Sequence, residues 1–182
     1  MHTKGCMDPK WLRNEGGKEV FPMKCLLIVY SYHHNNTQKV AEVMAKVLDA
    51  EIKTPQQTNP EEIQKYDLVG FGSGIDTDKN YKELLDFADR LPQVTDKKAF
   101  VFSTSGMPVG ISGQQQLEEY TRKCHKTLKE TLQSKGYTIV DEFGCAGFNT
   151  NNFLKWLGGI NKGRPNAEDL KHAEDFALKL KQ

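Results

Sequence analysis

The strongest constraint on the fold is a regular alternation between short, continuous apolar runs and longer segments with helical periodicity. The first run, CLLIV at 25–29, contains no charged or amide residue. Such a run is typical of a strand buried on both faces, so we expect a strand over 23–31. The next segment, 37–50, carries apolar residues at helical spacing with charges between them, at Val40, Val43, Met44, Val47 and Leu48.

The same alternation continues to the end of the chain. Four more strands are expected at 51–54, 66–74, 97–106 and 137–148, and three more helices at 80–91, 114–136 and 165–182. Pro92 and Gly136 mark the ends of two of these helices. Five strands alternating with helices predict an α/β fold of three layers, in which a doubly wound, five-stranded parallel sheet lies between helices and the crossovers are right-handed.

The length of 182 residues is most simply explained by one domain. We place this domain at 23–182 and expect residues 1–22 to be a loosely ordered extension or an added leader. The first residues hold no continuous hydrophobic stretch of the kind that a secretory signal needs, and Met23 is a possible natural start. We expect no chemistry from residues 1–22.

Composition and charge indicate a soluble protein and disfavour several classes of partner. Hydrophobic residues make up 37% of the chain and charged residues 27%, and no segment approaches transmembrane length. The net charge of +1 argues against nucleic acid and anionic membranes as partners. The four cysteines are far apart, with no CxxC pair, at Cys6, Cys25, Cys124 and Cys145. This pattern is typical of reduced thiols in a cytoplasmic protein, not of a disulfide framework or a zinc site.

Three polar loops are expected at one edge of the sheet. In open parallel sheets, ligands bind outside the carboxyl ends of the strands, near the point where strand order reverses. The loops that leave the first, third and fourth strands are SYHHNNT at 31–37, GSGIDTDKNY at 72–81 and STSGMPVGISGQQQ at 103–116. The last two are rich in Gly, Ser and Thr, which suits a backbone that approaches a ligand closely. Their coincidence is the main functional signal in the sequence.

The loop at 31–37 offers many neutral hydrogen-bond donors and no lysine or arginine. It leads into a helix, whose N-terminus attracts anions through free N–H groups and a partial positive charge. Hydroxyl and amide donors are added by Ser31, Asn35, Asn36 and Thr37. The loop matches neither GxxxxGK[ST] nor GxGxxG, which favours a terminal phosphate over a nucleoside triphosphate or a dinucleotide. The alternative is that Asn36 or Thr37 is an ordinary helix N-cap.

Four stretches of the sequence resemble flavodoxin-like proteins. YSYHHNNTQKVA is similar to the phosphate loop of that family, and YDLVGFGSGI to its third strand and first flavin-ring loop. FSTSGMPVG is similar to the fourth strand and second ring loop, and GINKGRPNAEDLKHAEDFA to the Gly-x-Pro entry into the last helix of one branch. The resemblance covers about residues 23–182 and implies the strand order 2-1-3-4-5.

The resemblance also implies FMN as the cofactor. The residues implied to hold its phosphate are Ser31, His33, His34, Asn35, Asn36 and Thr37. The residues implied to enclose its ring are Ser73, Gly74, Ile75, Asp76 and Thr77 on one side and Thr104, Ser105, Gly106, Met107 and Gly110 on the other. In that family a flexible glycine peptide lies beside flavin N5, and Gly74 is its best-placed counterpart.

The chain also departs from long-studied flavodoxins, which are strongly acidic and flank the ring with Trp and Tyr. The ring loops here offer Ile75, Met107, Val109 and Ile111, and Tyr81 only follows later. Asn35 stands where glycine is common in the family. Aliphatic side chains cover a flavin ring less fully than Trp and Tyr do. The near-zero net charge removes the usual argument for a basic redox partner.

Three functions therefore remain open. The first is an FMN electron-transfer protein that docks with redox partner proteins, and the second is an FMN-dependent NAD(P)H:quinone or small-electrophile reductase. The third is a flavin-free interaction domain of the same fold. We favour the electron carrier, because no nicotinamide-binding motif and no catalytic residue is evident in the sequence.

Other chemistry-bearing residues receive structural interpretations. His33 and His34 are adjacent and point different ways, which is poor geometry for a shared metal. His125 and His172 are expected on the surface, and Cys145 is expected to be a buried, inert thiol. Trp156 lies in a long glycine- and asparagine-rich connection. It is expected to pack against the sheet, to cap the flavin or to form a partner surface.

Overall fold

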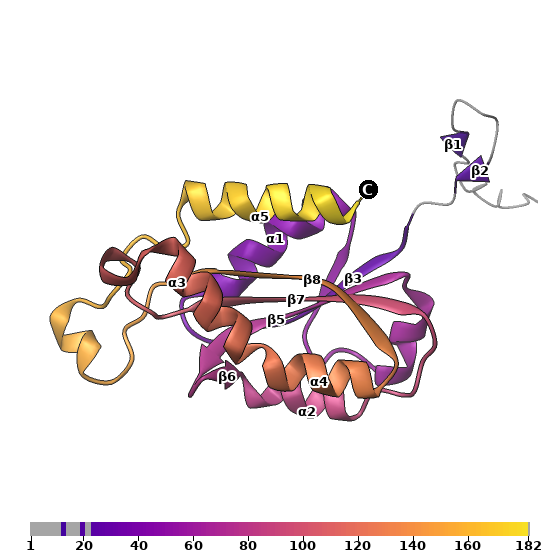
Figure 1. Cartoon of the computed structure of the whole chain (residues 1–182), viewed down its shortest axis with the longest axis horizontal. Helices are drawn as coiled ribbons and strands as arrows, with labels where there is room; N and C mark the ends of the chain where they lie inside the picture. The colour runs from indigo at the N-terminus through magenta and orange to yellow at the C-terminus, as the bar shows by residue number, and fades with distance from the viewer. Residues whose placement is uncertain (1–11, 14–18, 21–22, 182) are drawn as a thin grey trace, which may run out of the picture.

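The central sheet has the predicted architecture. The computed structural model describes residues 12–13, 19–20 and 23–181 (Figure 1). Five parallel strands lie in the order β4-β3-β5-β7-β8, which is 2-1-3-4-5 when they are counted along the chain, so the predicted order is confirmed. Their bounds are β3 (Cys25–Tyr30), β4 (Glu51–Lys53), β5 (Leu68–Asp76), β7 (Lys97–Ser105) and β8 (Tyr137–Ala146). A sixth strand that the sequence did not predict, β6 (Lys79–Asn80), pairs antiparallel with the end of β5.

Helices cover both faces of this sheet (Figure 1). On one side lie α1 (Asn36–Leu48) and α5 (Ala167–Leu180), and on the other α2 (Lys82–Asp89) and α4 (Lys126–Ser134). The predicted single helix at 114–136 is wrong. It is two helices, α3 (Val109–Cys124) and α4, which meet at His125. Short 3-10 helices lie at η1 (Pro60–Lys65) and η2 (Asn152–Leu157).

The core consists of one apolar layer on each face of the sheet. Successive residues of β3 point to opposite faces, so Leu27 packs toward α1 and α5, while Ile28 packs toward α2 and α4. This explains why its sequence is continuously apolar. Glycines in β5 make room for aromatic rings from β7, since a Cβ at Gly72 would lie 2.2 Å from the Phe102 ring.

The first 22 residues are described only in part. Within them, β1 (Leu12–Arg13) pairs antiparallel with β2 (Glu19–Val20), and the other residues of this segment lie outside the described part of the chain. The division into an extension and a domain stays a prediction. In the described residues, no helix has the length and apolar character that crossing a membrane requires.

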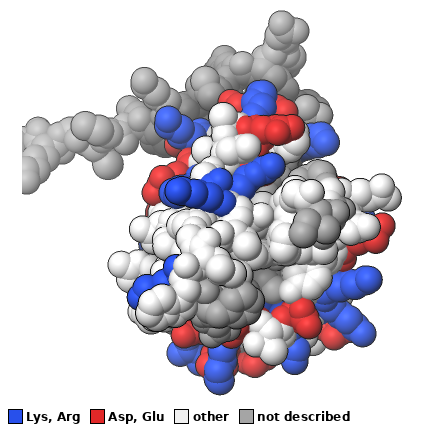
Figure 2. All heavy atoms as spheres, turned by 90° about the vertical axis from the view of Figure 1, so that its left-hand side faces the viewer, with Lys and Arg blue, Asp and Glu red and all other residues white. Residues whose placement is uncertain are grey.

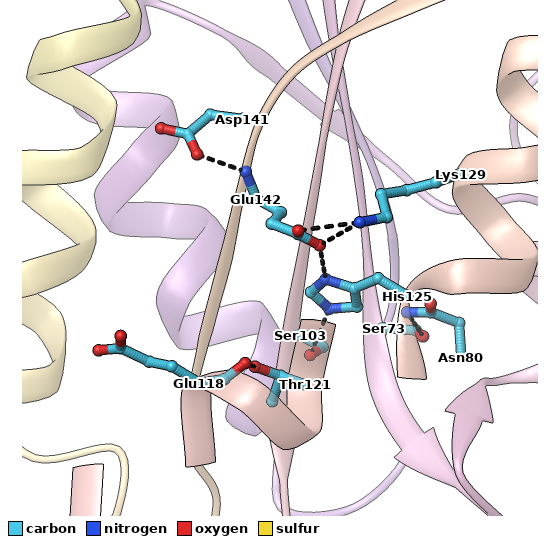
Figure 3. Close-up of polar contacts among 9 residues, drawn as sticks. All are labelled: Ser73, Asn80, Ser103, Glu118, Thr121, His125, Lys129, Asp141 and Glu142. Atoms are coloured by element: carbon cyan, nitrogen blue, oxygen red, sulfur yellow. Dashed lines mark hydrogen bonds and ion pairs between the residues drawn. The ribbon is translucent and has the colours of Figure 1, made fainter. Parts of the chain in front are cut away.

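His125 is buried, so its predicted position on the surface is wrong, whereas His172 is exposed as predicted. His125 lies where α3 meets α4, and the helix break turns its ring toward the sheet (Figure 3). Its Nδ1 lies 3.0 Å from Glu142 Oε2, and its Nε2 lies 2.8 Å from Ser103 Oγ. Lys129 Nζ also donates to Glu142, at 2.9 Å. The imidazole therefore joins the helix junction to both β7 and β8.

Burial sets the charge of this imidazole. It lowers the pKa of His125, and the hydrogen bond to Glu142 only partly opposes this effect. For Glu142, burial alone would raise the pKa, but hydrogen bonds from His125 and Lys129 lower it. A carboxylate only accepts hydrogen bonds, so the neutral ring carries its proton on Nδ1 and accepts from Ser103 at Nε2.

We expect stability to fall with acidification in two stages. Because the pKa of His125 is lowered on folding, its contribution is complete above the ordinary value of 6.5 and is lost as pH falls below it. The contribution of Glu142 is complete above its ordinary value of 4.5 and is lost at still lower pH. His125→Gln should cost about 1–3 kcal/mol at pH 7 and flatten the first stage in urea unfolding followed from pH 7.5 down to about pH 3. The matched control, His172→Gln, should leave both stages in place; a first stage that persists in His125→Gln would contradict this assignment.

Candidate functional site

The ends of β3, β5 and β7 are brought level by the pairing register of the sheet. Tyr30 pairs with Ser73, and Ser73 pairs in turn with Ser103. The loops that follow these strands therefore start side by side, at the left-hand end of the sheet in Figure 1. The sequence-based expectation that the three loops share one edge is met.

The first loop turns through two left-handed residues, His34 (φ 53°) and Asn35 (φ 52°). Asparagine adopts this conformation more readily than most residues. Asn35 is also the N-cap of α1, and its side chain makes no capping bond. The expectation that Asn36 or Thr37 is the N-cap is therefore wrong. Instead, Ser31 Oγ accepts from Gln38 N at 3.3 Å.

Two adjoining hollows lie at this edge. The first lies between the loop at 31–37 and the ends of β5 and β7, and the second lies beside the loops that follow β5 and β7. Of the predicted residues, the hollows bring together Ser31, His33, Asn36, Thr37, Gly74, Ile75, Asp76, Thr77, Thr104, Ser105, Gly106 and Met107. Among the described residues that line the hollows, none is lysine or arginine. Thr37 Oγ1 and Thr104 Oγ1 lie 2.8 Å apart and link the first loop to the third.

Four predicted residues do not line either hollow. His34 Nε2 lies 2.8 Å from Thr150 Oγ1, and Asn35 forms the turn described above. Ser73 is buried, and its hydroxyl donates to Gly74 O at 2.8 Å while it accepts from Asn80 Nδ2 and Tyr81 N. Gly110 lies in the first turn of α3, where an added Cβ would meet no atom within 4 Å.

Two glycines in the loops that follow β5 and β7, Gly74 and Gly106, are covered by side chains. A Cβ at Gly74 would lie 2.6 Å from the Tyr81 ring, and one at Gly106 would lie 2.3 Å from Asn149 Nδ2. Tyr81 also lines the first hollow, and burial raises its pKa to about 12. Its hydroxyl therefore stays protonated at neutral pH.

A fourth wall of the site was missed by sequence reasoning. It is the connection from β8 to α5, residues 147–164, which we call the arm. The arm is bonded to the first and third of the three loops: Gly147 N donates to Ser105 O at 2.8 Å, Asn36 Nδ2 to Phe148 O at 2.8 Å, and Asn161 Nδ2 to Met107 O at 2.8 Å. The only signal in the sequence is the asparagine content of this connection, and it does not say which loops the asparagines reach.

The structure also tests the predictions for Cys145 and Trp156. Cys145 is buried, as predicted, and burial raises the pKa of its thiol. The side chain of Trp156 is 90% exposed, so packing against the sheet is wrong for this residue. Among the described residues, no three His, Cys, Asp or Glu side chains converge in a way that could hold a metal.

Comparisons with solved structures show several proteins with a similar fold. The chain is similar to oxidised flavodoxin 2 from Bacillus cereus, with a TM-score of 0.62, 19% identity and coverage of 85% of this chain and 95% of that one. It is also similar to a Fusobacterium nucleatum flavodoxin bound to flavin mononucleotide (TM-score 0.58, 12% identity, 87% and 98% covered). An NADH:FMN oxidoreductase, EmoB, in its apo form has a TM-score of 0.55, 19% identity and coverage of 87% and 89%.

Sequence comparisons give more direct evidence of the family to which the chain belongs. An uncharacterized protein from Methanocaldococcus jannaschii is 42% identical over 158 residues, which covers 87% of this chain and 98% of the relative. A family profile described as a flavodoxin domain matches residues 27–177, nearly all of the sheet and its helices. With the predicted strand order and the three loops at one edge, this match identifies the chain as a member of the flavodoxin family.

Proposed function

We propose that this protein binds FMN and carries electrons between redox proteins. The observation that carries the proposal is the first hollow, where uncharged donors gather at the N-terminus of α1 beside Gly74 of β5 and Gly106, the residue after β7. A helix of 13 residues directs free N–H groups and a partial positive charge toward an anion at this point. The flavodoxin of Fusobacterium nucleatum, which is similar in fold, is bound to flavin mononucleotide.

The residues present fit FMN at both ends of the site. Near α1 the lining offers hydroxyl and amide groups for a phosphate and a polyol. Asn36 Oδ1 is buried and, within the described part of the chain, has no hydrogen-bond partner, so a ligand hydroxyl would satisfy it. The second hollow is bordered by aliphatic side chains from Ile75, Met107 and Leu154, which suits one side of a planar aromatic ring.

In this proposal each segment has a separate task. Thr37 and the first N–H groups of α1 hold the phosphate, and Ser31 keeps the helix start in place. Gly74 and Gly106 let Tyr81 and Asn149 pack closely against the backbone beside the ring site, where a larger residue would collide with them. When bound, FMN supplies the electron-transfer chemistry, and the protein tunes it through hydrogen bonds and nearby charge.

The assignment to a carrier rests on the lining of the two hollows. A nicotinamide dinucleotide brings further phosphates, and no basic side chain of the described residues lines either hollow to receive them. Redox partner proteins are then the natural electron donors and acceptors. We place the protein in the cytoplasm, because the cysteines that the structure describes are free and buried.

One observation favours a reductase as the second candidate. Tyr120 lines the second hollow and its hydroxyl donates to Asp78 Oδ1 at 2.7 Å. Burial and this hydrogen bond raise its pKa, so the hydroxyl keeps its proton. A small electrophile such as a quinone, seated against Ile75 and Met107, would find a polar group there. The NADH:FMN oxidoreductase of similar fold gives this candidate a precedent for the architecture alone.

The proposal is tested first by cofactor binding. We expect the purified protein to be yellow, or to take up one FMN per chain and quench its fluorescence, because the hollows provide one phosphate site and one ring site. Titration of FMN into the stripped protein measures both stoichiometry and quenching. A colourless protein that leaves FMN fluorescence unchanged would instead support a flavin-free interaction domain.

The phosphate site is tested by removing one hydroxyl. Thr37→Val keeps the shape of the side chain and should weaken FMN by about tenfold or more, since a hydrogen bond to a charged group contributes roughly 1.5–3 kcal/mol. Riboflavin, which lacks the phosphate, should lose much less affinity. Thr58→Val, at a buried threonine bonded to Thr54 O, is the matched control. Equal losses for FMN and riboflavin would mean that Thr37 does not hold the phosphate.

Carrier and reductase are separated by the source of electrons. With FMN bound, NADH or NADPH alone should reduce the protein slowly, while dithionite reduces it rapidly, because the described lining offers no cationic dinucleotide site. Stopped-flow absorbance measures both rates. Rapid reduction by NAD(P)H with steady quinone turnover, lost in Tyr120→Phe, would replace the carrier by the reductase.

A further inference from the structure

The arm projects from the body of the protein beside the proposed cofactor site. It is the light-orange segment at the left of Figure 1, and it carries the 3-10 helix η2 at its tip. Its base is closed by a bridge between Asn149 and Ile160, whose backbone groups exchange hydrogen bonds of 3.0 and 2.9 Å. The bonds from Asn36 and Asn161 described above hold the same base against the loops of the site.

The tip of the arm presents large apolar side chains to solvent. Trp156 is 90% exposed and the adjacent Leu157 is 73% exposed. Trp156 has the largest exposed fraction among the large hydrophobic residues of the described chain. Exposed tryptophan is costly in water and is enriched at the centres of protein interfaces. The base of the arm is bonded at several points, so Trp156 and Leu157 are exposed on a fixed segment and not on a free chain end.

The charge of the arm has one sign. Between Glu142 and Glu168 the sequence holds three basic residues and no acidic residue. Arg164 is paired with Asp169, a buried residue of α5. The other two, Lys155 and Lys162, are exposed, and neither forms an ion pair within the described residues. Lys155 lies at the tip beside Trp156 and Leu157, whereas Lys162 lies at the base of the arm, two residues after Ile160 of the bridge.

On the other side of the second hollow, Asp76 at the end of β5 is exposed, and the exposed Asp78 and Lys79 follow it, so both signs of charge occur there. Figure 2 views this end of the molecule and shows that uncharged side chains cover much of it, so positive charge on the arm is a local feature and not part of a broad basic face. Local charge of this kind orients a partner more than it increases overall affinity.

We propose that the arm, through Lys155 to Leu157 at its tip and Lys162 at its base, is the docking site for an acidic redox protein that has an apolar recess in its surface. This inference rests on the proposed function, since the partner is taken to exchange electrons with FMN. Leu154, next to the tip, lines the second hollow. A partner seated on Trp156 is thereby brought to the aliphatic side of the cofactor site.

Two other occupants fit less well. In a symmetric contact with a second copy of the chain, the same patch faces itself, so Lys155 and Lys162 would meet like charges. A lipid surface needs a longer amphipathic helix or a larger buried apolar area for stable binding than a six-residue 3-10 helix provides. An acidic protein surface meets both the charge and the apolar contact.

The test uses the full chain with FMN and follows the indole N–H resonance of Trp156 by NMR, assigned with a Trp156→Phe variant. The acidic probe is the soluble haem domain of cytochrome b5, and the basic probe is cytochrome c. We expect the acidic probe to shift this resonance at low salt and to lose the effect at high salt, while the basic probe leaves the resonance unchanged. Lys155→Glu with Lys162→Glu should weaken the acidic probe by about tenfold or more.

The matched control, Lys126→Glu with Lys135→Glu, makes the same change of net charge on and after α4 and should alter affinity by less than about twofold. Equal losses in both double variants, or a preference for cytochrome c, would overturn the proposal. A shift of the Trp156 resonance by phosphatidylserine vesicles but not by cytochrome b5 would also overturn it, in favour of lipid. The same titration is repeated on the chain without FMN, so a failure to bind FMN would count against the proposed function and would be seen separately from a failure to bind cytochrome b5.

Discussion

The structure depends most on the register between three parallel strands. Tyr30, Ser73 and Ser103 pair across β3, β5 and β7, so these strands end at one level and their loops begin together. Glycines in β5 support this arrangement, because only they leave room for the rings of Phe100 and Phe102 from the neighbouring strand. A shift of one residue would exchange the two faces of each strand and separate the loops. The site is therefore a consequence of how the core packs.

The site is completed by backbone bonded to side-chain amides. Asn36 and Asn161 reach from opposite sides to Phe148 O and Met107 O, and so fix the arm against the first and third loops. Neutral amides hold these segments without adding charge to the pocket. In the proposed function, the dipole of α1 is the main attraction for the phosphate, and the exposed charge of the arm is left for a partner protein.

Much of the fold could be predicted, because its determinants are local. Continuous apolar runs identify doubly buried strands, and the spacing from Val40 to Leu48 identifies a helix face. The placement of three loops at one edge follows from the parallel connections. These steps need only the period of each segment and the handedness of its crossovers.

What could not be predicted depends on contacts between distant residues. The helix break at His125 carries no proline or glycine, and the residue is buried because Glu142 and Ser103, far away in the chain, provide its partners. The position of Asn35 as the N-cap of α1 depends on a left-handed turn that Asn36 could equally have adopted. The arm has no hydrophobic period at all, so nothing in its sequence shows that it returns to Asn36 and Met107.

In the proposed function, three loops and the arm form a single FMN site. Hydrogen–deuterium exchange with and without FMN tests this directly, because each segment reports separately. We expect FMN to slow exchange together at residues 33–37, 74–77, 104–107 and 147–151, with little change in α4. Protection of other segments, or of the first loop alone, would contradict it.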